Sequence, residues 1–324
     1  MRRIIVVIGG TGKMGRTVIR HLLADRDQRW RVRLFTRNPH SHHAQQLEME
    51  GGERLEVTQG DLNDQKSLAS AFAGAYGVFC NTDFFSSANV QTEYEQGLRA
   101  LETARQAAIQ HFIYSSLDAG ASISHGRVPV PHYDAKAAVE HWIDMQRSHE
   151  FMQQETDGWY SRHVSVLVTG PYYENLQSIF LPQKGKLADG REGYIFKLAS
   201  GGKPYPMVAL EDIAWFVSFL LTHADEWGGR TLPILGESLS IAQVAATFER
   251  VTGKAAEWQD VPLEQIRSSG SPIAHDIAHM LQFFQEYGVT RDFELIRRLH
   301  PGLLSFEAWL RKTGWNGEAV QGTA

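Results

Sequence analysis

The sequence predicts an α/β protein with a doubly wound parallel sheet and a smaller, mainly helical C-terminal lobe. Two observations support this prediction. Over the first 170 residues, apolar runs such as 4–8 alternate with amphipathic segments such as 16–23. Strands that alternate with helices form right-handed βαβ units, whose parallel sheet is covered on both faces. After residue 170 the sequence becomes rich in proline and glycine, and its last third has a mainly helical pattern.

The elements of the first lobe follow one another along the chain. Residues 4–8 form a continuous β-branched run, which is typical of a strand buried on both faces. The helix expected next carries its apolar side chains on one stripe, formed by Val18, Ile19, Leu22 and Leu23. Further strands are predicted at 31–38, 54–62, 76–82, 111–117 and 161–170, and further helices at 44–52, 65–75, 89–109 and 132–145.

The second lobe is predicted to be discontinuous in the sequence. Residues 171–206 contain no long periodic segment, whereas 210–223 form a strongly apolar helix. The aromatic residues of that helix, Trp215, Phe216 and Phe219, are expected in the core or in the contact of a homodimer. We therefore expect a nucleotide-binding type of domain at 1–170 plus 207–235, a smaller lobe at 171–206 plus 236–318, and a flexible tail at 319–324.

The composition argues against several classes of protein. Lys and Arg number 32 and Asp and Glu number 37, so the formal net charge is −5 and we expect no direct nucleic-acid binding. No apolar run approaches the roughly 18 residues of a membrane span, and residues 1–10 do not resemble a signal peptide. Cys80 is the single cysteine and is expected to be a buried packing residue. Together these features predict a protein of the reducing cytoplasm.

The strongest motif is the glycine-rich turn between the first strand and the first helix. Gly9, Gly12 and Gly15 have the spacing G-x-x-G-x-x-G. Glycines at such a turn permit a sharp reversal, let the backbone approach a diphosphate, and let helix and strand pack closely. The helix N-terminus offers free N–H groups and a positive dipole end to the phosphates. We therefore predict a Rossmann fold whose dinucleotide is bound by Gly9, Thr11, Gly12, Lys13, Met14 and Gly15.

The end of the second strand favours NADP(H) over NAD(H). A chain that selects NAD usually has an acidic residue there, which binds the ribose 2′-hydroxyl. This chain has Thr36, Arg37 and Asn38 instead, and Arg37 can pair with a 2′-phosphate. Lys13, in the glycine turn, adds a second positive charge. The alternative for Arg37 is a surface position without a ligand.

The ends of three more strands supply the rest of the predicted site, since an open α/β sheet binds ligands at the carboxyl ends of its strands. Asp61 is expected to meet the adenine amino group, and the backbone of Asn81 and Thr82 is expected to line the adenosine. The residues expected near the nicotinamide follow the sixth strand and are Pro171, Tyr173 and Asn175. The alternative for this last segment is a domain-crossing loop held by aromatic packing.

Several segments resemble the NmrA-like branch of the atypical short-chain dehydrogenases/reductases. The resemblance rests on residues 9–15, Thr36-Arg37-Asn38-Pro39, Gly60-Asp61, Tyr114-Ser115, Lys136, 171–184, Arg291-Asp292 and 304–310. It implies a Rossmann lobe, a small C-terminal lobe and NADP(H) binding, with Ser115 and Lys136 beside the cofactor. It also implies that Phe84 and Phe85 belong to an aromatic loop at the edge of a cleft, where they either cover the nicotinamide or pack inside. Some members resemble nucleotide sensors that act on regulatory partners, and others are reductases of quinones, dyes or plant phenolics.

The catalytic motif of the wider superfamily is incomplete in this chain. That motif places a Tyr four residues before a Lys on a helix, so that both side chains share one face and the Tyr exchanges a proton beside the hydride transfer. Lys136 is present, but His132 stands four residues before it and Tyr133 three. Leu117 or Asp118 stands where a Ser is usual. We expect Lys136 as a ribose ligand, and His132 or Tyr133 either as a proton donor or as a packing residue.

These features predict an NADP(H)-binding sensor that acts on a regulatory protein partner. The alternative is an NADPH-dependent reductase of a quinone-like or aromatic small molecule, with a cleft lined by Phe84, Phe85 and Tyr173. No metal site is expected: His275 and His279 lie four residues apart on a predicted helix, but no third ligand has suitable spacing.

Overall fold

The computed structural model describes residues 2–155 and 158–320, and the chain divides into two compact units. Unit 1 comprises Met1–Leu117, His132–Val168 and Ile213–Pro233, and unit 2 comprises Asp118–Pro131, Thr169–Asp212 and Ile234–Ala324. The segment Asp118–Pro131 was expected in the first lobe but belongs to unit 2. Contacts inside unit 2 explain this assignment, since Arg291 binds Asp118 and a ring nitrogen of His279 contacts the Pro129 carbonyl.

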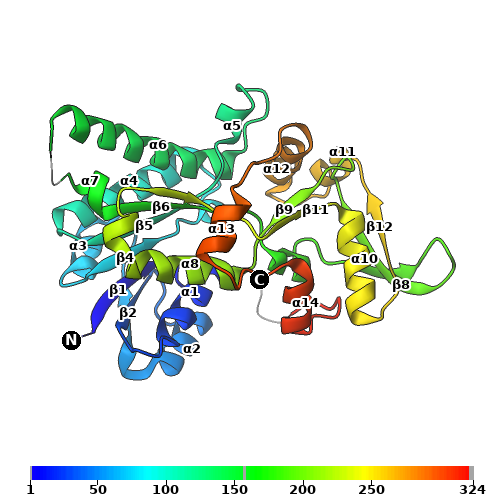
Figure 1. Ribbon diagram of the computed structural model, residues 1–324, viewed down its shortest axis with the longest axis horizontal. Helices are drawn as coiled ribbons and strands as arrows, with labels where there is room; N and C mark the ends of the chain where they lie inside the picture. The colour runs from blue at the N-terminus through cyan, green and yellow to red at the C-terminus, as the bar shows by residue number, and fades with distance from the viewer. Residues whose placement is uncertain (1, 156–157, 321–324) are drawn as a thin grey trace. The chain divides into compact units, whose positions relative to one another are not determined.

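Unit 1 contains the predicted parallel sheet, with seven strands in the order β10-β6-β5-β4-β1-β2-β3 (Figure 1). Every neighbouring pair in it is parallel. The strands are β1 (Arg3–Ile8), β2 (Trp30–Thr36), β3 (Leu55–Gln59), β4 (Gly77–Cys80), β5 (His111–Ser116), β6 (Val164–Val168) and β10 (Thr231–Pro233). The strand order reverses between β1 and β4, which is where such sheets bind ligands beyond the strand ends. The Rossmann fold class is therefore confirmed.

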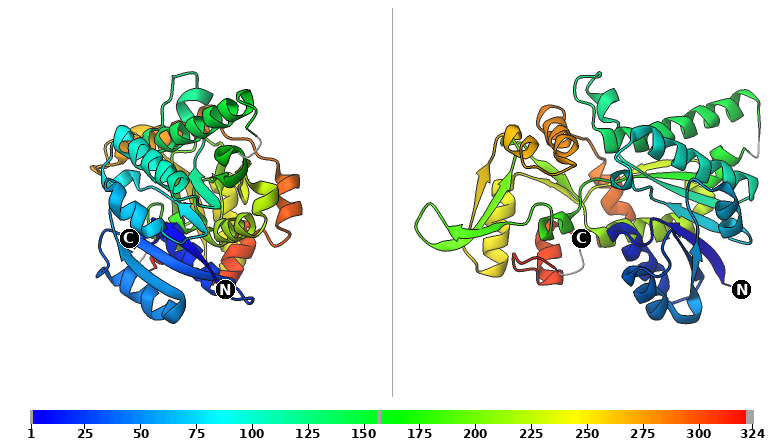
Figure 2. Two further views of the ribbon diagram at one scale, coloured as in Figure 1. Left: turned by 90° about the vertical axis from the view of Figure 1, so that its left-hand side faces the viewer. Right: turned by 180° about the vertical axis from the view of Figure 1, so that it is seen from behind.

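Helices cover both faces of this sheet (Figure 2). One face packs against α3 (Gln65–Phe72), α4 (Val90–Gln106) and α6 (Pro131–Met152), which share one apolar core with β1, β4, β5 and β6. The other face packs against α1 (Lys13–Leu23), α2 (His42–Gly51) and the part of α8 (Leu210–Thr222) that lies in unit 1. The remaining elements of unit 1 are η1 (Gly52–Arg54), η2 (Phe84–Ser86), α7 (Trp159–His163) and α9 (Ala224–Trp227).

Side chains at the helix starts explain where several of these helices begin. Ser41 accepts a hydrogen bond from the Ala44 amide at the start of α2, and Asn89 accepts one from the Thr92 amide at the start of α4. Such caps satisfy backbone donors that the helix itself leaves without a partner. In α8, Phe216 is fully buried while Trp215 stacks on Phe219 at 5.3 Å between ring centroids, so this aromatic stripe contributes to the core of unit 1.

Unit 2 contains more strands than the sequence predicted. In it β8 (Glu192–Leu198) pairs antiparallel with β7 (Gln183–Lys186) and parallel with β12 (Ala256–Asp260), and β9 (Tyr205–Met207) pairs antiparallel with β11 (Glu237–Leu239). Residues 171–206 thus hold three strands where we expected none. The missed pattern is the alternation of buried Tyr194, Phe196 and Leu198 along β8, which has the period of two of a half-buried strand.

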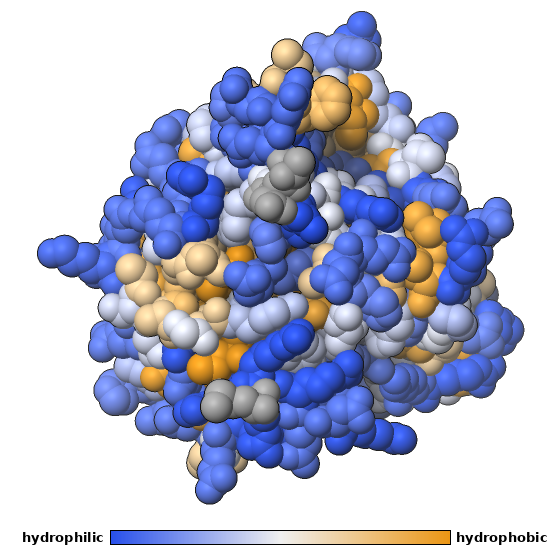
Figure 3. Space-filling model, turned by 60° about the vertical axis from the view of Figure 1, so that its left-hand side comes forward, coloured by the Kyte–Doolittle hydropathy of each residue, from blue (hydrophilic) through white to orange (hydrophobic). Residues whose placement is uncertain are grey.

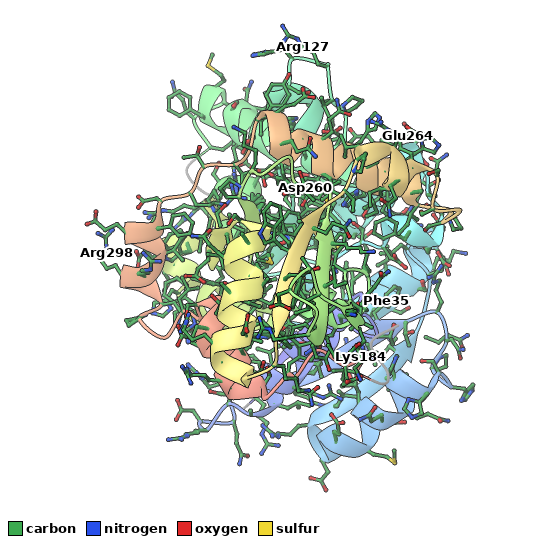
Figure 4. All side chains as sticks on the ribbon, turned by 90° about the vertical axis from the view of Figure 1, so that its right-hand side faces the viewer. Phe35, Arg127, Lys184, Asp260, Glu264 and Arg298 are labelled. Atoms are coloured by element: carbon green, nitrogen blue, oxygen red, sulfur yellow. The ribbon has the colours of Figure 1, made fainter. Side chains whose placement is uncertain are left out.

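The helices of unit 2 agree better with the sequence pattern. They are η3 (Tyr173–Gln177), α5 (Gly120–Ile123), α10 (Ile241–Thr252), α11 (Leu263–Arg267), α12 (Ala274–Glu286), α13 (Phe293–Leu299) and α14 (Phe306–Thr313). Asp260, labelled at the end of β12 in Figure 4, accepts hydrogen bonds from the amides of Ser200 and Gly201 and so fixes the turn after β8. Lys184 on β7, labelled in the same view, pairs with Glu318 at 2.6 Å.

The surface of the described residues is mixed in character. On the face seen in Figure 3, hydrophobic side chains lie in small groups between hydrophilic ones. The most exposed large hydrophobic side chains are Phe151, at the end of α6, and Met49, in α2. No helix between residues 2 and 320, the unplaced pair 156–157 aside, is long and apolar enough to cross a membrane.

Candidate functional site

The glycine turn joins β1 to α1 and contains two glycines that the fold itself requires. Gly9 has a φ of +75°, and a Cβ there would lie 2.3 Å from the carbonyl oxygen of Asn81. A Cβ at Gly15 would lie 2.2 Å from the Gly9 carbonyl oxygen. At Gly12 the nearest atom would be the same oxygen, at an ordinary 3.4 Å. Packing within the chain therefore explains Gly9 and Gly15, whereas the absent side chain of Gly12 leaves an open approach to the turn.

The first turn of α1 has the electrostatic character of an anion site. Its N-cap, Gly12, offers no side-chain acceptor, and the first turn holds no acidic residue. Thr11 and Lys13 are half-buried, and Met14 and Gly15 are buried. The first N–H groups of a helix have no partner within it, and the helix dipole adds partial positive charge at this end.

The segment after β2 is held by its own polar groups. Thr36 Oγ1 accepts a hydrogen bond from the Asn38 amide at 3.3 Å, and Asn38 Oδ1 accepts one from the His40 amide at 3.0 Å. Arg37 is exposed, and its guanidinium has no hydrogen bond or ion pair with any other residue whose placement is described. This side chain is therefore available to an anion from outside the chain.

Sequence analysis missed a further basic group near this segment, in addition to Lys13 and Arg37. Arg16, in the first turn of α1, is almost fully buried and contacts the ring of His43 at the start of α2. Burial and the neighbouring Arg16 charge lower the pKa of His43 below its ordinary value. The sequence carried a signal for Arg16, because this residue directly follows Gly15, the last glycine of the motif.

The carboxyl end of β4 holds the ammonium of Lys136, which comes from α6. Its Nζ lies 2.8 Å from the Thr82 carbonyl oxygen, 2.9 Å from Thr82 Oγ1 and 3.3 Å from Asn81 Oδ1. It also pairs at 3.0 Å with Glu93 Oε1, from the first turn of α4. Sequence analysis missed Glu93, which is fully buried and accepts the Thr82 hydroxyl at 2.6 Å.

Aromatic rings surround His132, which occupies the position of the catalytic tyrosine in the superfamily motif. His132 is 8% exposed and Tyr133 is 2% exposed, with 4.6 Å between their ring centroids. The His132 ring also lies 6.1 Å from the Phe84 ring and 5.2 Å from the Phe85 ring. Phe84 is buried, whereas Phe85 is 44% exposed. The burial of His132 and Tyr133 favours a packing role for both over a role as proton donor.

Both serine hydroxyls at the end of β5 have hydrogen-bond partners within the chain. Ser115 is buried and donates to the sulfur of Met14 at 3.6 Å, and Ser116 donates to Glu140 Oε2 at 2.6 Å. Within unit 2, Asp118 binds Arg291 through both carboxylate oxygens, at 2.9 and 2.8 Å. Ser115 thus touches the glycine-turn residue Met14, as a cofactor-site position should, but its hydroxyl already has a partner.

Asp61, after β3, has a local structural role. Its Oδ1 accepts a hydrogen bond from the Asn63 amide at 2.7 Å, and its own amide donates one to Ser67 Oγ at 3.1 Å. These bonds order the turn that leads into α3. Contact between Asp61 and an adenine stays a prediction.

The segment after β6 corrects one sequence-based expectation. Tyr173 was expected to wall a cleft, but its side chain is fully buried within unit 2. Its ring lies 5.5 Å from Phe306 and 5.7 Å from Trp309, and its hydroxyl donates to the Leu304 carbonyl at 3.4 Å. Aromatic packing, the alternative weighed for this segment, therefore explains Tyr173.

The neighbours of Tyr173 are held through their backbone. The Pro171 carbonyl accepts a hydrogen bond from Val208 at 2.9 Å, and the Asn175 amide donates to the Tyr172 carbonyl at 3.0 Å. Pro171 is buried and Asn175 is half-buried. Their contact with a nicotinamide stays a prediction.

Comparison with known proteins identifies the family and the fold. Residues 1–310 match the NmrA-like family. An NmrA-like family domain-containing oxidoreductase of Aspergillus hancockii is 28% identical over 268 residues, which is 81% of this chain and 76% of that protein. Structures of NmrA, a negative transcriptional regulator, in complex with NAD and with NADP each give a TM-score of 0.72 at 20% identity, covering 96% of this chain and 95% of theirs. An NADPH-dependent quinone oxidoreductase from Escherichia coli, complexed with NADPH, gives 0.71 at 19% identity, covering 96% of this chain and 100% of its own.

Proposed function

Because the chain belongs to the NmrA-like family, we propose that it binds NADP(H) and acts as a nucleotide sensor with an incomplete reductase centre. One observation carries this proposal. The glycine turn has the form that a diphosphate needs, whereas the two aromatic residues before Lys136 are buried, Tyr133 at 2% and His132 at 8% exposure. A reductase of the short-chain type needs a proton donor that reaches its substrate.

The basic residues around the turn support NADP(H) as the nucleotide. The diphosphate would lie against the open position of Gly12 and the first N–H groups of α1. Arg37, exposed and without a partner among the described residues, would pair with the 2′-phosphate. The structures of a related regulator with NAD and with NADP, and of a quinone oxidoreductase with NADPH, support binding of a nicotinamide dinucleotide.

A sensor must convert occupancy into a change that a partner recognises. A nucleotide can shift a conformational equilibrium only if it binds the two conformations with different affinity. The segment between Thr82 and Glu93 meets this need, because both of its ends bind Lys136 and it carries the exposed ring of Phe85. We infer that a regulatory protein or a second copy of the chain recognises this segment.

Titration with NADPH, NADP and NADH, followed by a screen of quinone and dye acceptors, tests the proposal. The expected result is tight binding of NADPH and NADP without steady oxidation of NADPH. Steady turnover that is abolished by Lys136→Ala would contradict the sensor role and assign a catalytic one.

A second candidate function is reduction of a quinone-like or aromatic molecule by NADPH. The exposed Phe85 ring, 5.2 Å from that of His132, is the observation that favours it, because it offers an aromatic surface next to a residue one helical turn before Lys136. The relative from Aspergillus hancockii is named an oxidoreductase. This candidate fails if confirmed NADPH binding is accompanied by no turnover with any acceptor of the screen.

A further inference from the structure

Lys136 stands where three elements of unit 1 meet. Its helix, α6, brings the ammonium to the end of β4, where Asn81 and Thr82 lie, and to Glu93 on α4. The side chain of Lys136 is 9% exposed and that of Glu93 is not exposed at all. The pair is therefore a buried ion pair at the edge of the proposed nucleotide site.

All three protons of the Lys136 ammonium have hydrogen-bond acceptors in this network. A lysine ammonium has three protons to donate. Thr82 Oγ1 donates to Glu93 at 2.6 Å, so it accepts from Lys136 at 2.9 Å. Together with the Thr82 carbonyl at 2.8 Å and Glu93 Oε1 at 3.0 Å, three acceptors lie close to the ammonium. Asn81 Oδ1, at 3.3 Å, is the most distant acceptor and the one that an incoming hydroxyl would replace most easily.

Apart from the neutral hydroxyl of Thr82, the ammonium of Lys136 is the donor that binds the Glu93 carboxylate in the described part of the chain. Its second oxygen, Oε2, receives no hydrogen bond from any residue in the described ranges. A buried charge is strongly unfavourable unless an opposite charge compensates it. The buried carboxylate of Glu93 and the buried ammonium of Lys136 therefore compensate each other's charge, and each makes the burial of the other less unfavourable.

We propose that Glu93 is a positioning residue for nucleotide binding, which compensates the charge of Lys136 and holds its ammonium at the end of β4. This inference rests on the proposed function, because it assumes that the ribose of the nucleotide reaches Lys136 there. Glu93 itself is fully buried. Its removal therefore acts on the nucleotide through the two groups that it binds, Lys136 and Thr82, of which Lys136 carries the charge.

The other titratable groups around the pair do not compete for this role. Burial raises the pKa of Cys80, on β4, to about 12 and holds that of Tyr114, on β5, well above its ordinary value, so both stay neutral near pH 8. Glu140, on α6, binds Ser116 instead. His132 lies one turn before Lys136, so the test begins at pH 7.5, about one unit above the ordinary pKa of histidine, and includes the wild type as the reference for any histidine contribution.

The test measures NADPH affinity between pH 7.5 and 9.5 for the wild type, Glu93→Gln and Glu93→Asp, with Glu140→Gln as the matched control. We expect nearly constant affinity for the wild type and for the control. Glu93→Gln should lose about tenfold or more across this range, because an uncompensated buried ammonium gives up its proton, and tenfold corresponds to one pH unit of such a titration. Glu93→Asp, which keeps the charge, should restore most of the flat profile.

The double variant Glu93→Gln/Lys136→Met separates charge compensation from a merely structural role. It removes both charges, and replacing a buried ion pair by neutral groups is often tolerated. If Glu93→Gln does not fold but the double variant does, Glu93 compensates Lys136 as proposed. If neither folds, or if Glu93→Gln binds NADPH with the flat profile of the wild type, the inference is overturned.

A readout without nucleotide distinguishes this inference from the proposed function. Acetylation at pH 8.5, followed by mass spectrometry, should spare Lys136 in the wild type, label it in Glu93→Gln, and label the exposed Lys66 equally in both. If the wild type binds no nicotinamide dinucleotide, the proposed function fails, yet this labelling still reports on the charge pair. Equal labelling of Lys136 in both proteins would refute the pairing itself.

Discussion

At the scale of single residues, the surroundings decide which side chains can act. Lys136 and Tyr173 are both expected to reach a ligand from the sequence pattern. The structure places the Lys136 ammonium at a strand end and buries the Tyr173 ring against Phe306 and Trp309. Arg37 differs from both, because it is exposed and has no partner among the described residues.

Arg37→Ala should weaken NADPH binding by about 10- to 100-fold while NADH binding changes little. The reason is the loss of a charge-assisted bond to the 2′-phosphate, which contributes about 1.5–3 kcal/mol. Fluorescence titration with both nucleotides measures this effect. Arg31→Ala, which removes an arginine of β2 that pairs with Glu56, should affect neither nucleotide. Equal losses for NADPH and NADH in Arg37→Ala would exclude the 2′-phosphate assignment.

Gly15→Ala should lower the stability of the fold, whereas Gly12→Ala should lower the affinity for NADPH. The Cβ at position 15 would lie 2.2 Å from a backbone oxygen, so we expect the free energy of unfolding to fall by about 2 kcal/mol or more. Gly12 has the ordinary φ of −77° and space for a Cβ, so Gly12→Ala should unfold like the wild type but bind NADPH more weakly. Urea denaturation measures the stability of each variant, and titration with NADPH measures its affinity for the nucleotide. A stable Gly15→Ala variant would show that the turn relaxes.

At the scale of elements, a helix can depend on a side chain from a distant part of the chain. The start of α8 is bound by Glu174 of η3, whose carboxylate accepts the Leu210 amide at 3.2 Å and Trp309 Nε1 at 3.0 Å. Burial raises the pKa of Glu174 to about 7, and the partial positive charge of the helix start compensates this only in part. The sequence places these three residues far apart, so no local pattern indicates the contact.

Glu174→Gln should change how the stability of unit 2 depends on pH. Because the folded-state pKa is raised from 4.5 to about 7, the wild type has its full contribution below about pH 4.5 and loses it as the pH rises through 7. The loss amounts to about 3 kcal/mol at most. The amide of Gln keeps an acceptor for Leu210 and Trp309 without this titration. Thermal unfolding at pH 5 and pH 8 should show Glu174→Gln more stable than the wild type at pH 8 only, and the same difference at both values would contradict the assignment.

At the scale of the whole molecule, the chain consists of two units, and each contains a buried titratable group whose pKa is shifted. In unit 1, His111 is fully buried beside Ser165, and burial lowers its pKa to about 4. A buried neutral histidine opposes protonation, whereas Glu174 in unit 2 opposes ionisation. The two units should therefore respond to pH in opposite directions.

The unfolding of unit 1 should become easier as the pH falls from 6.5 towards 4. The unfolded chain then binds a proton that folded His111 does not, which removes up to about 3 kcal/mol of stability. Calorimetry between pH 4.5 and 8 should show one transition that shifts down in acid and another, from unit 2, that shifts down in base. His111→Gln should reduce the acid shift only. A single transition that moves one way over the whole range would refute the independent response.

Much of the fold is predictable from the sequence, because its causes are local. The alternation of β-branched runs with amphipathic stripes predicts the parallel sheet, and Gly9 and Gly15 stand where a Cβ would collide with backbone. Strands β7, β8 and β9 escaped the prediction, since they are short and lie among prolines and glycines. Short strands are stabilised mainly by pairing with distant segments.

Some features of the candidate site are likewise predictable from the sequence, and others depend on the tertiary structure. The sequence by itself determined the glycine turn, the position of Arg37 and the absence of a tyrosine four residues before Lys136. Only the tertiary structure decided that Glu93 compensates Lys136 and that Tyr173 belongs to the core. The physical reason is that turns and motif spacing depend on neighbours along the chain, whereas burial and charge compensation depend on groups that folding brings together from distant elements.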